Sequence, residues 1–205
     1  MRAIMQELYS LSLEELDSQI RDETASMSWP PVQEALDFAY KAHEGQKRTA
    51  SERPYIVHPI RVALILLRVA EQKNPAIICA GLLHDVLEDS DVLEEEIERK
   101  FGSQVLDLVL SLTHPPLKEG ETKFERNKKM FENMRWHGRD THIIKSADRL
   151  DNLFTATQAL NDARLDEYLI ESEEYLLPLT LASNTALYHA LNEAIQKLKL
   201  SRPET

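Results

Sequence analysis

The chain has 205 residues, enough for one domain with a substantial core, and 42% of them are hydrophobic while 29% are charged, as in globular proteins. The formal net charge of −11 argues against nonspecific binding to nucleic acid or an anionic membrane, and no apolar run approaches the roughly 18 residues that span a bilayer. The single cysteine, Cys79, excludes an internal disulfide and a cysteine-based zinc site, and the first residues lack a signal-peptide pattern, so we expect a cytoplasmic protein.

The composition predicts an all-α fold. Only 5 glycines are present, which is few for a β fold with many tight turns, and strong helix formers occur in nearly every segment. Residues 1–28 are expected to form short helical pieces, an arm on a main domain that spans 29–200. In the first half of the chain we expect a break at Trp29–Pro31, a helix over Val32–His43, a polar loop over Glu44–Arg53, a helix from Pro59 and a helix from Asn74–Pro75.

The second half continues the helical pattern. Asp91 and Glu94 have capping-box spacing for a helix that ends near Gly102, and Ser103 can cap the next one. Further on we expect a stop at His114–Pro116, an exposed helix or mobile loop over Lys118–Arg135, a helix capped by Asp140, a turn at Asn161–Asp162, one or two helices with a kink or boundary at Pro178, and a polar tail after Leu200.

The run Leu82–Asp89 carries the strongest chemical signal. It contains His84-Asp85 and Glu88-Asp89 inside one apolar helical stretch, so the four ionisable groups are expected to share about one helical face. Imidazole and carboxylate groups beside a core are costly unless they are paired or bind a metal. The run therefore indicates a cation.

Two distant residues can complete a ligand set. His58 precedes a proline in an apolar context, and Asp148 lies beside core-type residues. Taken singly, each of these residues is more often a hydrogen-bonded core histidine or a surface ion-pair partner than a ligand. Together with His84 and Asp85 they suit a divalent first-row cation such as Mn²⁺, Fe²⁺ or Zn²⁺, with positions left for a bound water.

These residues resemble the motifs of a known family, the HD-domain hydrolases, and in particular the hydrolase domain of the RelA/SpoT alarmone enzymes and their stand-alone relatives, the small alarmone hydrolases. The chain length leaves no room for the further domains of the long enzymes, which favours the stand-alone class. The matching segments are Ala42–Arg48, Pro54–Pro59, Gly81–Asp89 and Lys145–Asn152.

The resemblance implies an HD-domain helical bundle of about ten helices and a Mn²⁺ ion held by His58, His84, Asp85 and Asp148. It implies hydrolysis of the 3′-pyrophosphate from guanosine tetra- and pentaphosphate, giving GDP or GTP plus pyrophosphate. It also implies that Glu88 and Asp89 activate or orient water. The residues that we expect at the nucleotide are Arg48, Tyr55, Lys145, Arg149 and Asn152, of which Tyr55 and Arg149 have equally good structural interpretations, as packing and ion-pair residues.

The chain departs from the family pattern at two places. The loop Arg48–Tyr55 is one residue longer and lacks a glycine, and Asp151 stands where a histidine is common. Two alternatives stay open: a phosphohydrolase of the same fold for another nucleotide such as NADPH, and a non-catalytic nucleotide-sensing module. The native metal and homo-oligomer formation are also left open.

Overall fold

The computed structural model describes residues 2–49 and 51–201, and the chain divides into two compact units, Met1–Thr113 and His114–Thr205. Every regular element in the described residues is helical, and the one β-bridge, between Lys47 and Pro54, is isolated. The all-α prediction is therefore confirmed. No helix among these residues is both long enough and apolar enough to cross a membrane.

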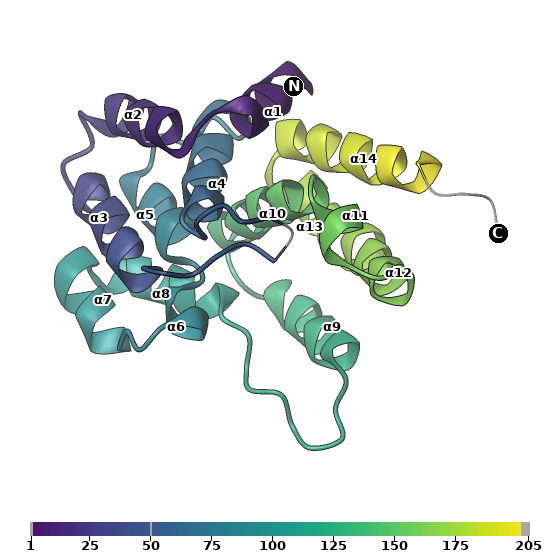
Figure 1. Ribbon diagram of the computed structural model, residues 1–205. Coiled ribbons are helices and arrows are strands. Elements are labelled where there is room, and N and C mark those ends of the chain that lie inside the picture. The colour runs from purple at the N-terminus through teal and green to yellow at the C-terminus, as the bar shows by residue number, and fades with distance from the viewer. Residues whose placement is uncertain (1, 50, 202–205) are drawn as a thin grey trace. The chain divides into compact units, whose positions relative to one another are not determined.

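The first unit is built around helix α4, which is buried at every position from Val57 to Leu67 (Figure 1). Helix α5 packs against α4, α3 and α8, and its residues Ala76–Leu83 are buried as well. The helices of this unit are α1 (Arg2–Ser10), α2 (Leu13–Thr24), α3 (Val32–Ala42), α4 (Val57–Arg68), α5 (Pro75–Leu83), α6 (Val86–Asp89), α7 (Glu94–Phe101) and α8 (Ser103–Leu112).

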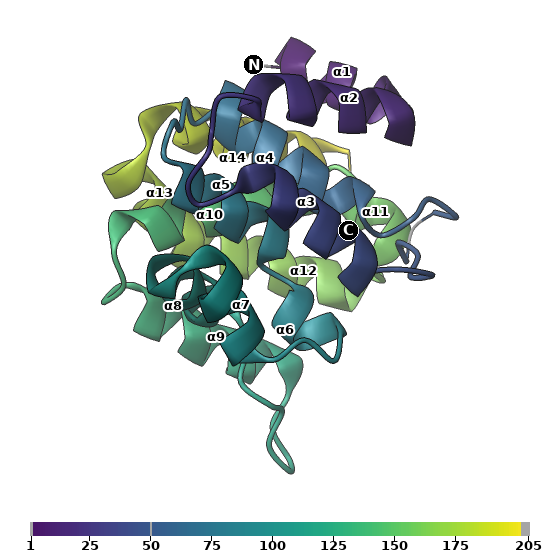
Figure 2. The ribbon, with the colours of Figure 1, turned by 90° about the vertical axis from the view of Figure 1, so that its left-hand side faces the viewer.

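Helices α1 and α2 occupy the segment for which short helical pieces were predicted, and α2 packs on α4 and α3 within the first unit (Figures 1 and 2). Their apolar residues Met5, Leu8, Leu16 and Ile20 are buried. Two arginines of α4 contact α1 and α2: the Arg61 guanidinium lies 4.1 Å from the centre of the Tyr9 ring, and Arg68 bonds the carboxylate of Glu23. Helices α1 and α2 are thus held in the first unit by apolar burial and by two arginines of α4.

The second unit is arranged around α10, which packs against α13 and α14. Twelve of its fifteen residues are buried, from Thr141 to Leu153 except Asn152. A π-helix precedes α13, with Pro178 in the first turn of α13, where the boundary was predicted. The helices are α9 (Lys123–Met134), α10 (Arg139–Leu153), α11 (Ala156–Ala159), α12 (Asp162–Ile170), η1 (Glu171–Leu176), α13 (Leu177–Ser183) and α14 (Thr185–Leu200).

Several helix ends follow local chemistry. The side chain of Asn74 accepts from Ala76 N at 3.0 Å, as predicted for a helix that opens on Asn-Pro, and Gly102 has the positive φ of 86° that ends α7. The predicted Asp91–Glu94 capping box is wrong, because α7 begins at Glu94 and its N-terminus is capped by Glu96, which accepts from Leu93 N.

Other ends moved by one or two residues from the prediction. Helix α4 begins at Val57 instead of Pro59, so His58 lies inside the first turn. Ser103 is the first residue of α8, and Asp140 lies within the first turn of α10, so neither is a cap. The polar tail predicted after Leu200 lies outside the described residues except for Ser201.

Candidate metal centre

Three of the four predicted ligands come together in the first unit. His58 lies on the buried first turn of α4, and His84 and Asp85 follow the last residue of α5. The two imidazoles are 1% and 3% exposed, whereas the Asp85 side chain is 20% exposed. Gly81 allows the approach of the two helices, since a Cβ there would lie 2.5 Å from Leu66 Cδ1. Close packing of α5 on α4 therefore brings His84 to His58.

The donor atoms of these residues face one another. His84 Nε2 lies 3.2 Å from His58 Nε2 and 3.1 Å from Asp85 Oδ2, and His58 Nε2 lies 3.6 Å from the same carboxylate oxygen. The Nδ1 of His84 donates to the carbonyl of Gly81 at 2.8 Å, which leaves Nε2 with its lone pair in the neutral ring. A metal-ligating histidine is typically oriented in this way through its other nitrogen. The donor set fits a divalent first-row cation.

The predicted continuous helix through this run is wrong. Helix α5 ends at Leu83, and the four-residue helix α6 starts at Val86, with Asp85 as its N-cap residue. The carbonyl of Asp85 accepts from both Glu88 N at 3.1 Å and Asp89 N at 2.9 Å. The break turns His84 and Asp85 toward His58 and places Glu88 and Asp89 on a separate exposed turn.

Asp89 has an unusual electrostatic setting. Its pKa is raised, first by partial desolvation of the carboxyl group and then by the negative charges of Asp85 and Glu88. A carboxyl group with a raised pKa is a better proton acceptor once it is ionised. The geometry thus supplies a basic group one turn from a candidate metal ligand.

Asp148, the fourth predicted ligand, belongs to the second unit. It lies on α10 and is 5% exposed. Lys145 Nζ lies 2.9 Å from Asp148 Oδ2, and Asn152 Nδ2 donates to Asp148 Oδ1 at 2.6 Å. Both side chains that we expected at the substrate therefore contact the carboxylate of the predicted ligand.

Arg149 has an extensive set of partners within the second unit. Its guanidinium lies 3.1 Å from Glu171 Oε2, donates to Tyr168 O and Ser172 Oγ at 3.2 Å, and sits 3.7 Å from the centre of the Tyr168 ring. Glu171 is fully buried and also accepts from Arg164 at 2.9 Å. Of the two sequence interpretations of Arg149, this arrangement matches the ion pair.

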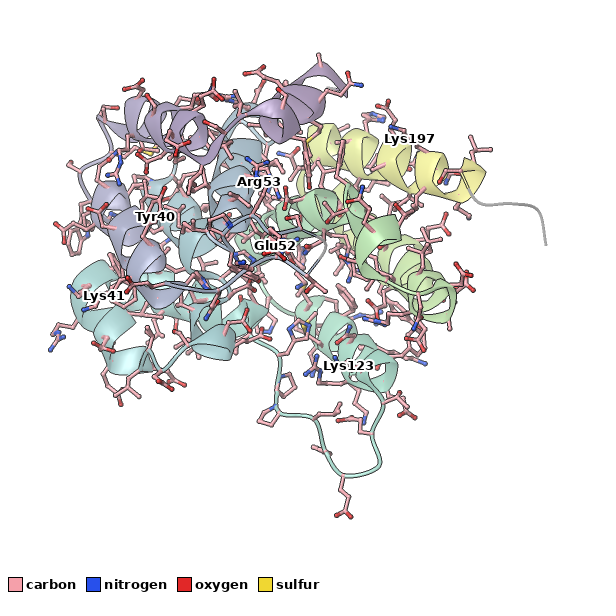
Figure 3. The ribbon with its side chains drawn as sticks, in the orientation of Figure 1. Tyr40, Lys41, Glu52, Arg53, Lys123 and Lys197 are labelled. Carbon is pink, nitrogen blue, oxygen red and sulfur yellow. The ribbon has the colours of Figure 1, made fainter. Side chains whose placement is uncertain are left out.

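The loop between α3 and α4 carries the remaining candidates. Gly45, at φ 76°, starts it, and it closes as a hairpin in which Tyr55 N donates to Gln46 O at 2.9 Å and Arg48 N to Arg53 O at 3.1 Å. The Arg48 guanidinium lies 5.5 Å from the centre of the Tyr55 ring. Arg53, labelled in Figure 3, bonds the carbonyl of Leu11 in the turn between α1 and α2.

Tyr55 contacts a predicted ligand, and Gln46 contacts the turn that follows it. The Tyr55 hydroxyl donates to Asp85 Oδ2 at 2.5 Å, a contact to a predicted ligand that the sequence did not indicate. Gln46 was not predicted as a site residue, although it lies in the motif Ala42–Arg48. It lines, with Asp89, Lys41 and Phe38, a cavity of about 490 Å³. Its position in that motif is the sequence feature that could have indicated Gln46 as a site residue.

Comparison with known proteins shows the family of the chain. Residues 35–172 match the model of the HD domain family. The chain is 32% identical to the mouse guanosine-3′,5′-bis(diphosphate) 3′-pyrophosphohydrolase MESH1 over 173 residues, which cover 82% of this chain and 94% of the relative. It is 33% identical over 155 residues, 69% of this chain, to a probable guanosine-3′,5′-bis(diphosphate) 3′-pyrophosphohydrolase of Mycoplasma pneumoniae, but spans only 21% of that relative's length.

A solved structure is also similar. It is described as a metazoan ortholog of SpoT that hydrolyses ppGpp and plays a role in starvation responses. It superposes with a TM-score of 0.72 at 30% sequence identity, covering 81% of this chain and 94% of the other. The similarity therefore extends over both compact units of the chain.

Proposed function

The chain belongs to the HD domain family, and from this premise we propose that it hydrolyses the 3′-pyrophosphate of ppGpp and pppGpp, releasing pyrophosphate and GDP or GTP. The observation that carries the proposal is the convergence of His58, His84 and Asp85 on one point within a chain similar to ppGpp hydrolases. The proposed partner is thus a guanosine tetra- or pentaphosphate in the cytoplasm.

The proposed metal is Mn²⁺, with Fe²⁺ and Zn²⁺ as alternatives, held by His58, His84, Asp85 and Asp148. When bound, such an ion polarises phosphoryl oxygens and lowers the pKa of a coordinated water. His84 is oriented for this role by its bond to Gly81, which makes Nε2 the unprotonated nitrogen of the neutral ring. Lys145 and Asn152 are proposed to orient Asp148, since each contacts one of its carboxylate oxygens.

Glu88 and Asp89 are proposed to accept the proton of the attacking water. Their turn is exposed, and the raised pKa of Asp89 makes its ionised form a stronger base than an ordinary aspartate. Arg48 is proposed to stack on the nucleobase, because its guanidinium already lies near an aromatic ring on the hairpin. Arg149 is proposed to act as a structural residue through Glu171.

The test is product identity from a nucleotide panel. Purified protein with Mn²⁺ is incubated with ppGpp, pppGpp and NADPH, and pyrophosphate and orthophosphate are measured separately. We expect pyrophosphate from the two guanosine nucleotides, and Asp85→Ala is expected to abolish both its release and metal binding. Orthophosphate from NADPH alone would favour the alternative phosphohydrolase, and binding of ppGpp without turnover over a range of metals would favour a non-catalytic module.

A further inference from the structure

The hairpin between α3 and α4 delivers two side chains to the candidate metal centre. Because Tyr55 N donates to Gln46 O and the next residues inward, Lys47 and Pro54, pair as a β-bridge, residues 46 and 55 are held side by side. Tyr55 donates to the carboxylate of Asp85, and Gln46 donates to the backbone carbonyl of Asp89. The same closed loop therefore touches both a predicted ligand and a predicted proton acceptor.

The amide of Gln46 has a fixed orientation. Its Nε2 donates to the carbonyl oxygen of Asp89 at 2.6 Å, so its Oε1 must be the atom 2.8 Å from His43 Nδ1. A carbonyl oxygen can only accept, so His43 carries its proton on Nδ1. Burial lowers the pKa of His43, which favours this neutral form. The result is a continuous connection from His43 through Gln46 to the backbone of the α6 turn.

His43 also supports Tyr55. The two ring centres are 4.7 Å apart, at an angle of 38° between the ring planes, and His43 is 3% exposed. The Tyr55 hydroxyl donates to Asp85 Oδ2 at 2.5 Å, and a carboxylate oxygen can only accept. A hydrogen bond from a hydroxyl group to a carboxylate is among the stronger kinds in proteins. Contact with the tilted His43 ring thus limits the directions in which this donor can point.

We propose that His43, Gln46 and Tyr55 form a brace that positions Asp85 for metal binding and Asp89 for proton transfer. The inference rests on the proposed function and adds positioning residues to it. Within the brace, Tyr55 bonds the predicted ligand Asp85 and also contacts the Asp89 carboxylate, whereas Gln46 bonds the backbone of the α6 turn and no predicted ligand, so their removal should have different effects. This role for Tyr55 differs from the nucleotide contact that the family resemblance suggests.

The first experiment removes only the Tyr55 hydroxyl. In Tyr55→Phe the ring remains beside His43 and Arg48, but Asp85 loses the hydrogen bond from the hydroxyl group. We expect the metal-free variant to bind Mn²⁺ about 10- to 100-fold more weakly than the metal-free wild type does, as measured by isothermal titration calorimetry. Tyr40→Phe is the matched control, because it removes a hydroxyl that bonds Asp17 elsewhere in the same unit, and its Mn²⁺ affinity should equal that of the wild type.

The second experiment removes the amide of Gln46. Gln46→Met keeps the length of the side chain but loses both hydrogen bonds, and the ligand Asp85 keeps its bond from Tyr55. We expect kcat to fall about tenfold or more, while KM and Mn²⁺ affinity stay within about twofold of the wild type. A change in KM alone would overturn the assignment of Gln46 as a positioning residue.

The outcomes separate the brace from the activity. Unchanged Mn²⁺ affinity in folded Tyr55→Phe, with a raised KM for ppGpp, overturns the brace and makes Tyr55 a substrate contact while the hydrolase stands. Weaker Mn²⁺ binding in Tyr55→Phe, together with a wild-type protein that does not hydrolyse ppGpp, supports the brace and refutes the proposed substrate. Circular dichroism of each variant establishes that it is folded.

Discussion

Replacing Arg149 by methionine tests whether this residue serves the fold or the substrate. The side chain is 4% exposed, and its partner Glu171 is fully buried. Removing one member of a buried ion pair typically costs about 3–5 kcal/mol, because the other charge stays buried. Glu171 keeps Arg164 at 2.9 Å and Asn127 at 3.1 Å, so we expect the lower end, about 3 kcal/mol.

That loss is large for a chain of this size. At about 2–4 °C per kcal/mol for 150–250 residues, Arg149→Met should lower the Tm by about 6–12 °C, measured by calorimetry and checked by urea unfolding. Arg164→Met is the comparison variant: the Arg164 side chain is 23% exposed, and Glu171 would keep Arg149 and Asn127, so the loss of stability should be smaller than in Arg149→Met. The reasoning is refuted if Arg149→Met melts like the wild type and instead raises KM for ppGpp.

Three further predictions concern the first unit. Asp89 has a raised pKa in the folded state, so the folded protein keeps the proton of this carboxyl group to a higher pH than the unfolded chain does, and the stability that this adds is lost as the pH rises through the folded-state pKa. In EDTA, the free energy of unfolding of Asp89→Asn should therefore increase relative to that of the wild type as the pH rises from about 4 to 7. A difference that does not depend on pH would contradict this. Gly81→Ala should destabilise the protein by about 1–3 kcal/mol in urea unfolding, because the new Cβ meets Leu66, and a wild-type midpoint would show that α4 yields easily. Cys79, whose pKa burial raises to about 12, should not react with a thiol reagent in the folded protein, and rapid labelling would disprove its burial.

The sequence predicted those parts of the molecule that depend on near neighbours. The Asn74-Pro75 start of α5 and the end of α7 at Gly102 are local caps, and both were identified correctly. The trio of His58, His84 and Asp85 was predictable because two members are adjacent and the third lies on an apolar helix. Long-range packing was needed to bring them within 4.8 Å of one another.

The parts that the sequence did not predict depend on distant contacts. Arg149 meets a glutamate 22 positions away, and Arg53 meets a carbonyl 42 positions away, so no local spacing indicates either partner. The break between α5 and α6 is similar, because His84 and Asp85 favour continued helix only slightly less than their neighbours do. Their orientation toward His58 is a tertiary effect that overrides the helical period.

The burial of α4 has a consequence for the choice of ion. His58 lies on helix α4, whose residues from Val57 to Leu67 are all buried, so the surrounding packing holds its imidazole in place. Asp85 lies at the break between helices α5 and α6, next to the short exposed turn of α6. For the proposed metal centre we therefore expect an ion of larger radius to be accommodated by displacement of Asp85, so that the preference between Mn²⁺ and the smaller Zn²⁺ would depend on the stiffness of the turn at residues 84–89.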